Sequence, residues 1–72
     1  MQRFGEKLRA LRQKRGLSLR QLGELLGVYH NHVAQLESGK RIPNAAMILK
    51  IADLFGVSTD VLMRDELDLD EV

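Results

Sequence analysis

The side chains best suited to specific chemistry are two amides and a hydroxyl, those of Asn31, Gln35 and Ser38. Their spacing of four and three residues places them on one side of an α-helix. Amides and hydroxyls donate and accept hydrogen bonds without carrying a net charge. A helix face opposite the core normally carries Lys and Glu, so this face is unusual. Its groups are suited to a second surface that also donates and accepts hydrogen bonds.

The hydrogen-bonding groups of this face match the base edges in the major groove of DNA. Gln and Asn can pair with N6 and N7 of adenine through two hydrogen bonds, and Ser can read several bases. Ala34 lies on the same side, and its methyl group can pack against the methyl group of thymine. A polar face open to water is the alternative, and the residues alone leave both interpretations open.

A helix must carry this face, and the apolar pattern predicts one from about residue 29 to residue 37. At about 100° per residue, Val33 and Leu36 point away from the amides and toward a core. His30 and His32 lie on the two flanks, about 200° apart, so they are poorly placed to share a metal ion. We therefore expect no metal site.

The preceding helix begins at Ser18, which has the spacing of a capping box with Gln21, and it ends at Gly27. Its apolar face is expected from Leu22, Leu25 and Leu26. The Gly27-Val28 connection is short, so the two helices should cross at a large angle, as in a helix-turn-helix. Gly23 costs its helix about 1 kcal/mol relative to Ala, which close approach of the next helix would explain.

Three further helices complete an all-α fold of five helices. The first ends at Gly16, and its stripe at helical spacing consists of Phe4, Leu8, Leu11 and Arg15. The fourth opens at Pro43 or Asn44, ends at Gly56 and has a stripe of Met47, Ile48, Ile51, Ala52 and Phe55. The fifth begins at Ser58, and its inward-facing residues are Val61 and Leu62.

Composition limits the classes of protein. The 72 residues suggest one domain, and a hydrophobic fraction of 44% is enough for a core. The absence of cysteine excludes disulfides and thiolate zinc sites, and it favours a cytoplasmic location. No apolar run approaches the roughly 20 residues that span a membrane. We expect no enzyme activity and no cofactor, because the sequence offers neither a nucleophile with its base nor a glycine-rich phosphate loop.

Charge is unevenly distributed along the chain, although the formal net charge is +1. Residues 1–50 contain ten Lys or Arg and three Asp or Glu, whereas residues 51–72 contain one Arg and seven acids. The first part could attract a polyanion. Residues 65–72, DELDLDEV, are expected to form a frayed acidic tail after a domain of residues 1–64. This tail could improve solubility, lead to a further domain, or act as an intramolecular brake on the basic surface.

The stretch LSLRQLGELLGVYHNHVAQLESGKRIP, residues 17–43, resembles the helix-turn-helix of the XRE family, the type of the lambdoid-phage repressors and Cro. With IADLFGVSTDVL at residues 51–62, the resemblance extends from Phe4 to about Leu62. It implies a five-helix, lambda-repressor-like DNA-binding domain. The chain departs from the family pattern at Leu19, where Gln is common, and at Gly23, where Ala is usual.

The resemblance also assigns DNA contacts residue by residue. Base contacts fall on His30, Asn31, Gln35 and Ser38. Phosphate contacts fall on Ser18, Leu19, Arg20, Tyr29, Lys40, Arg41 and Asn44. Independently, helix N-termini offer free N–H groups to anions, and Lys and Arg attract phosphates. Arg12 and Glu37 match a structural ion pair of the family, with two independent surface charges as the alternative.

The implied function is sequence-specific regulation of transcription. We expect a small homodimeric repressor or autoregulator of a prokaryote or phage, acting at the nucleoid and reading a palindromic double-stranded operator through the major groove. Two copies would read half-sites about 34 Å apart. The dimer interface is expected from Leu62, Met63 and Leu67, although these residues could instead complete the core. The alternative is an antitoxin or adaptor that binds a partner protein. No small-molecule ligand is expected.

Overall fold

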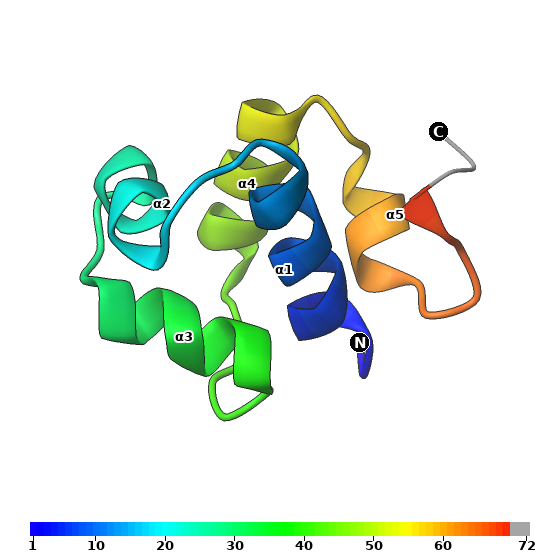
Figure 1. The fold of residues 1–72 in the computed structure, drawn as a ribbon. Helices are drawn as coiled ribbons and strands as arrows, with labels where there is room; N and C mark the ends of the chain where they lie inside the picture. The colour runs from blue at the N-terminus through cyan, green and yellow to red at the C-terminus, as the bar shows by residue number, and fades with distance from the viewer. Residues whose placement is uncertain (70–72) are drawn as a thin grey trace.

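Five α-helices form within residues 1–69, the residues that the computed structural model describes (Figure 1). They are α1 (Phe4–Lys14), α2 (Leu19–Leu26), α3 (His30–Ser38), α4 (Ala45–Phe55) and α5 (Thr59–Met63). No strand occurs among these residues. The predicted all-α fold is therefore confirmed, and each helix lies where the sequence predicts it.

Polar caps and glycines set the helix ends. Ser18 and Gln21 form the predicted capping box, in which Ser18 Oγ accepts a hydrogen bond from the Gln21 backbone N–H at 3.0 Å. The side chains of Asn44 and Ser58 cap α4 and α5 in the same way. Gly27 ends α2 at a φ of 77°, a left-handed conformation that a side chain would strain. The chain can therefore turn sharply from α2 into α3.

One hydrophobic core joins the five helices. It consists of Phe4, Leu8, Leu11, Leu22, Leu26, Val33, Leu36, Ile48, Ile51, Ala52, Phe55 and Leu62. Leu25 is 51% exposed, so its predicted place on the apolar face of α2 is wrong. The reason is that α3 begins against Gly23, which shifts the buried side of α2 toward Leu22, Gly23 and Leu26. Leu25 is thereby turned outward.

Two glycines let α3 approach the other helices. A Cβ at Gly23 would lie 2.6 Å from the carbonyl oxygen of Val28 and 3.3 Å from the backbone nitrogen of His30. The predicted close approach at Gly23 is therefore confirmed. A Cβ at Gly5 of α1 would lie 2.6 Å from the carbonyl oxygen of Leu36. Backbone contact thus fixes α3 at its start against α2 and near its end against α1.

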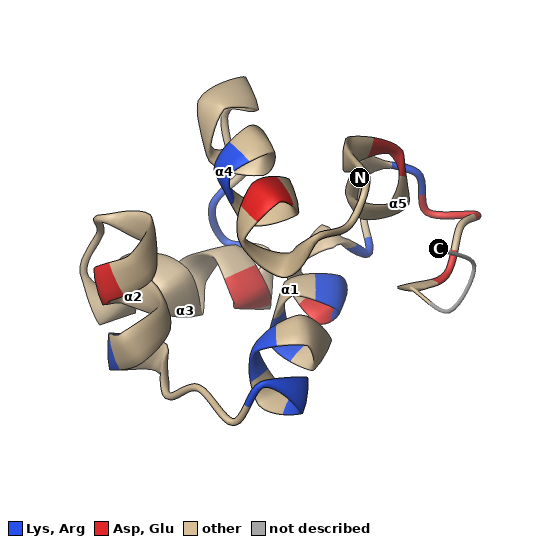
Figure 2. Ribbon diagram, turned by 90° about the horizontal axis from the view of Figure 1, so that it is seen from above, with Lys and Arg blue, Asp and Glu red and all other residues tan. Residues whose placement is uncertain are grey.

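Charge is divided between two sides of the molecule. Figure 2 shows basic residues along α1, and acidic residues on α5 and the segment that follows it. Helix α1 lies between α3 and α5 (Figure 1), so this acidic segment is on the far side of α1 from α3. As far as the structure describes it, the segment does not cover the outer side of α3, and a brake on the basic surface stays a hypothesis.

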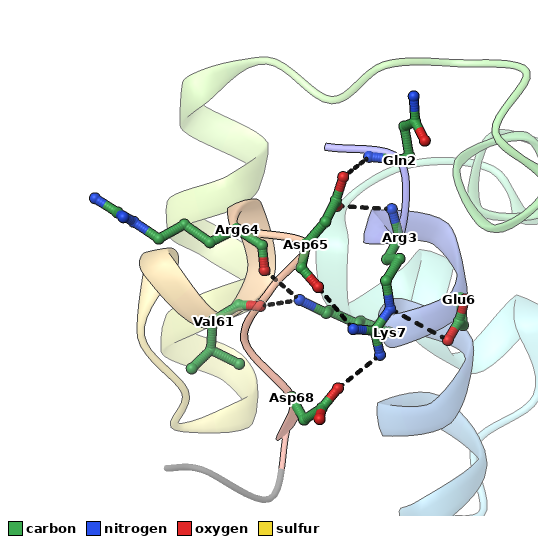
Figure 3. A network of polar contacts seen from close by, with 8 residues as sticks. All are labelled: Gln2, Arg3, Glu6, Lys7, Val61, Arg64, Asp65 and Asp68. Atoms are coloured by element: carbon green, nitrogen blue, oxygen red, sulfur yellow. Dashed lines mark hydrogen bonds and ion pairs between the residues drawn. The ribbon is translucent and has the colours of Figure 1, made fainter.

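The segment after α5 folds back on the start of α1 (Figure 3). The Asp65 carboxylate accepts hydrogen bonds from the backbone N–H groups of Arg3 and Gln2, both at 2.9 Å. These bonds hold the pKa of Asp65 below its ordinary value. Asp68 pairs with the Arg3 guanidinium at 2.9 Å. The expected fraying is therefore wrong for residues 65–69, because Asp65 and Asp68 find partners at the start of α1. Residues 70–72 of the expected tail lie outside the described residues.

Lys7 connects α1 to α5 from inside the protein. Its side chain is buried, and its Nζ donates to the carbonyl oxygens of Val61 at 2.6 Å and Arg64 at 2.7 Å (Figure 3). Carbonyls at a helix C-terminus lack partners within the helix, so a cation there is well placed. The ammonium group of Lys7 therefore holds the end of α5 against α1.

Candidate nucleic-acid interface

The outer side of α3 carries the groups that the sequence analysis assigns to base edges. Its exposed or partly buried residues are His30, Asn31, Ala34, Gln35 and Ser38. Val33 and Leu36 are buried on the opposite side of the helix. Figure 1 shows α3 along one edge of the molecule, with its outer side turned away from α1 and α4. The structure therefore brings the amides and the hydroxyl together on one accessible face.

An ion pair fixes the end of α3 to α1. The Arg12 guanidinium donates from Nε and Nη2 to the two carboxylate oxygens of Glu37, at 2.7 and 3.1 Å. Its Nη1 also donates to the carbonyl oxygen of Leu17 at 2.9 Å. The Arg12 and Glu37 side chains are only 13% and 8% exposed, so they are not independent surface charges. The hydrogen bond to Glu37 raises the pKa of Arg12 above its ordinary value.

The start of α2 presents backbone N–H groups beside α3. Ser18 uses its own N–H and its hydroxyl oxygen in the capping box. Leu19 packs against the core, so only its backbone can meet a phosphate. Arg20 is exposed and adds a positive charge at the same end of the helix. These features are typical of anion binding at a helix N-terminus.

Tyr29 stands at the junction of α2 and α3. It is 84% exposed and occupies the N-cap position of α3, but its side chain does not cap the helix. A groove of about 690 Å³ runs beside it, between Arg20 and Glu24 of α2 and His30 of α3. The first N–H groups of α3 therefore have no side-chain cap.

The loop after α3 supplies two cations and contacts Gln35. Lys40 and Arg41 are both exposed. Arg41 Nε donates to Gln35 Oε1 at 3.1 Å, and the Arg41 backbone N–H donates to the carbonyl oxygen of Gln35 at 3.2 Å. Asn44 uses its amide oxygen to cap α4 through the Met47 N–H at 2.8 Å, which leaves its amide nitrogen free to donate.

Arg9 belongs to the same surface, although the sequence analysis did not select it. It is exposed on α1 and lines a groove of about 230 Å³ together with Leu19, Ala34 and Ser38. It lies three residues before Arg12 and therefore on the same side of α1. The three-residue spacing between Arg9 and Arg12, which binds Glu37 of α3, is the sequence signal that could have identified Arg9.

The expected dimer residues differ in exposure. Leu62 is fully buried in the core of the protomer, so its predicted place on a dimer surface is wrong. It instead completes the core, as the alternative interpretation held. Met63 is 43% exposed and Leu67 is partly buried. Met63 is therefore the best placed of the three to meet a second copy.

Within residues 1–69, no group of three or more His, Asp or Glu could hold a metal ion. None of the described helices combines the length and the apolar character that a membrane crossing requires.

Comparison with known proteins identifies relatives along the whole chain. A family profile described as a helix-turn-helix domain matches residues 3–67. The chain is 33% identical over 72 residues to YonR of Bacillus subtilis (strain 168), an SPbeta prophage-derived uncharacterized HTH-type transcriptional regulator, and the match covers 96% of this chain and 67% of YonR. It is 38% identical over 73 residues to the HTH-type transcriptional repressor RghR of the same organism, and this match covers 100% of this chain and 54% of RghR.

A solved structure shares the arrangement of the helices. The P22 c2 repressor, determined in complex with a synthetic operator, matches with a TM-score of 0.81 and 28% sequence identity over 88% of this chain and 96% of that chain. The five helices therefore have the lambda-repressor-like fold that the sequence predicts.

Proposed function

The chain belongs to the helix-turn-helix domain family, and we propose that it regulates transcription by binding a palindromic operator as a homodimer. The observation that carries this proposal is the accessible face of α3, where the amides of Asn31 and Gln35 and the hydroxyl of Ser38 lie opposite the core. Such uncharged donors and acceptors are the groups that read base edges in the major groove.

Cations and helix ends around this face support phosphate binding. Arg20, Lys40 and Arg41 are exposed, and Arg9 adds a fourth charge beside Ala34 and Ser38. The α2 N-terminus adds backbone N–H groups beside Arg9, since Leu19 and Arg9 line the same groove. Phosphate contacts would fix the register of α3, while the amides would supply the sequence preference.

The size of one copy favours a dimer. The molecule measures 28 × 23 × 19 Å, which is shorter than the roughly 34 Å between half-sites one helical turn apart. One copy therefore reaches one half-site, and two copies related by a two-fold axis would read a palindrome. The name of RghR as a repressor, and the operator bound to the P22 c2 repressor, support repression as the outcome.

Selection of random DNA duplexes by the purified chain tests this function. We expect enrichment of one palindromic motif with half-sites about one helical turn apart. The double variant Asn31→Ala and Gln35→Ala serves as the control, because it removes the amides and leaves every cation in place. The control should retain salt-dependent binding without enriching the motif. If the unaltered chain enriches no sequence, operator binding is contradicted.

A further inference from the structure

The loop after α3 turns back and attaches itself to Gln35. Gly39 has a φ of 84°, which reverses the direction of the chain after Ser38. Arg41 then meets Gln35 twice, through its backbone N–H to the Gln35 carbonyl oxygen at 3.2 Å and through Nε to Oε1 at 3.1 Å. The Ser38 hydroxyl donates to the same carbonyl oxygen at 3.2 Å. Arg41 is therefore fixed relative to Gln35 by main chain and side chain together.

This contact determines which way the Gln35 amide faces. An arginine Nε–H can only donate, so the amide atom beside it must be the oxygen. The amide nitrogen, with its two donors, is then on the other side of the planar group. Gln35 and Arg41 line a groove of about 420 Å³ together with Asn31 and His32. The amide oxygen of Gln35 therefore faces Arg41, and the two N–H donors of the amide are left for other partners.

We propose that Arg41 is a positioning residue that holds Gln35 as a hydrogen-bond donor and thereby favours guanine at the base pair that Gln35 reads. This inference rests on the proposed function. A freely rotating Gln pairs with adenine, because it accepts from N6 and donates to N7. When its oxygen is directed at Arg41, the two donors of the amide nitrogen match the two acceptors of guanine, N7 and O6. The N6 amino group of adenine would meet a donor instead of an acceptor.

The contact leaves the charge of Arg41 available. Gln35 is neutral, so the guanidinium keeps its full charge, and its terminal amino groups can still donate to a phosphate. Arg41 would thus act on phosphates directly and on base preference through Gln35. Removing Arg41 should change both properties, whereas removing the neighbouring cation Lys40 should change only the first.

Relative affinities for operators that differ at single base pairs test the inference. The comparison uses four proteins: the unaltered chain, Arg41→Ala, Gln35→Ala and the matched control Lys40→Ala. Circular dichroism checks that each one is folded. We expect the unaltered chain to prefer guanine over adenine at one base pair by about fivefold or more. Arg41→Ala should lose this preference and should instead bind more tightly to the operator with adenine at the same position. Lys40→Ala should bind all sequences more weakly and keep the guanine preference.

Each other outcome has a distinct meaning. A guanine preference that survives in Arg41→Ala, or an adenine preference in the unaltered chain, would overturn the positioning role while leaving operator binding intact. A guanine preference that survives in Gln35→Ala but is lost in Arg41→Ala would overturn it as well, because Arg41 would then read the base itself. Absence of any sequence preference in the unaltered chain would reject the proposed function together with this inference.

Discussion

At the scale of single residues, Asn31 offers the most direct test of base reading. It is exposed on the outer side of α3, one turn before Gln35. A good pair of hydrogen bonds to adenine contributes about 1–3 kcal/mol of discrimination. Asn31→Ala should therefore reduce the affinity for the selected operator by that amount and leave affinity for random DNA almost unchanged. Gel-shift titration on both DNAs measures the two effects, and equal losses on both would contradict base reading by Asn31.

Residues on the helix surface were predictable where the pattern was local. The exposed face of α3 and the buried Val33 and Leu36 follow from helical periodicity alone. The Gln35–Arg41 contact was missed because a turn separates the two residues. Helical periodicity does not extend across that turn, so it could not indicate that Arg41 contacts Gln35. Lys7 was missed because lysine normally marks the solvent side of a helix. Its carbonyl partner Val61 lies 54 residues away, so no local pattern could have indicated its burial.

At the scale of elements, the Arg12–Glu37 pair determines how α3 is held against α1. Both side chains are largely buried, so removing either one leaves an unpaired charge. Arg12→Ala and Glu37→Ala should each lower the free energy of unfolding by on the order of 3 kcal/mol. The double variant should cost less than the sum of the two, because it leaves neither charge unpaired. Urea unfolding of all four proteins measures this coupling.

Additivity of the two substitutions would show that the pair acts as separate charges, contrary to the geometry. Operator binding gives a second measurement on the same variants. A tilted α3 would misplace its amides, so the single variants should lose discrimination more than they lose affinity for random DNA.

Helix boundaries were predictable because capping chemistry is local. Ser18 with Gln21, Asn44, and the left-handed Gly27 each specify an end without reference to the rest of the fold. The orientation of α2 about its own axis was less predictable. Leu25 belongs to the apolar pattern as well as Leu22 does, and only the close approach at Gly23 decides that Leu25 faces solvent. Leu62 is buried because α5 packs against α1 and α4, as its predicted inward-facing position indicated, and only its alternative assignment to a dimer surface was wrong.

At the scale of the whole molecule, Asp65 joins the two ends of the described chain. Its lowered pKa means that its carboxylate contributes stability above the ordinary carboxyl pKa of about 3.9. That contribution is lost as the pH falls through the lower pKa of the folded state. Asp65→Asn should therefore destabilise the protein at neutral pH, and the difference from the unaltered chain should shrink below about pH 4.

Urea unfolding across this pH range measures the difference between the two proteins. Asp53→Asn is a suitable control, because Asp53 is exposed on α4 and lies in a different part of the molecule. A difference for Asp65→Asn that stays constant from neutral to acidic pH would mean that the carboxylate charge does not hold the chain ends together.

The proposed dimer would give one small domain enough reach to be specific. Met63 remains 43% exposed after Leu62 has entered the core, and it follows the Val61–Leu62 pair that anchors α5. An exposed apolar side chain at a rigidly held helix end is suited to a symmetric contact with a second copy.

Met63→Glu places two like charges at that contact and should weaken the dimer by about tenfold or more. Sedimentation velocity over a range of concentrations measures this, with Leu25→Glu as the control because Leu25 is similarly exposed on α2. If both variants sediment as the unaltered chain does, α5 is not the dimer surface. If the unaltered chain itself is a monomer at every concentration, DNA alone brings the two copies together.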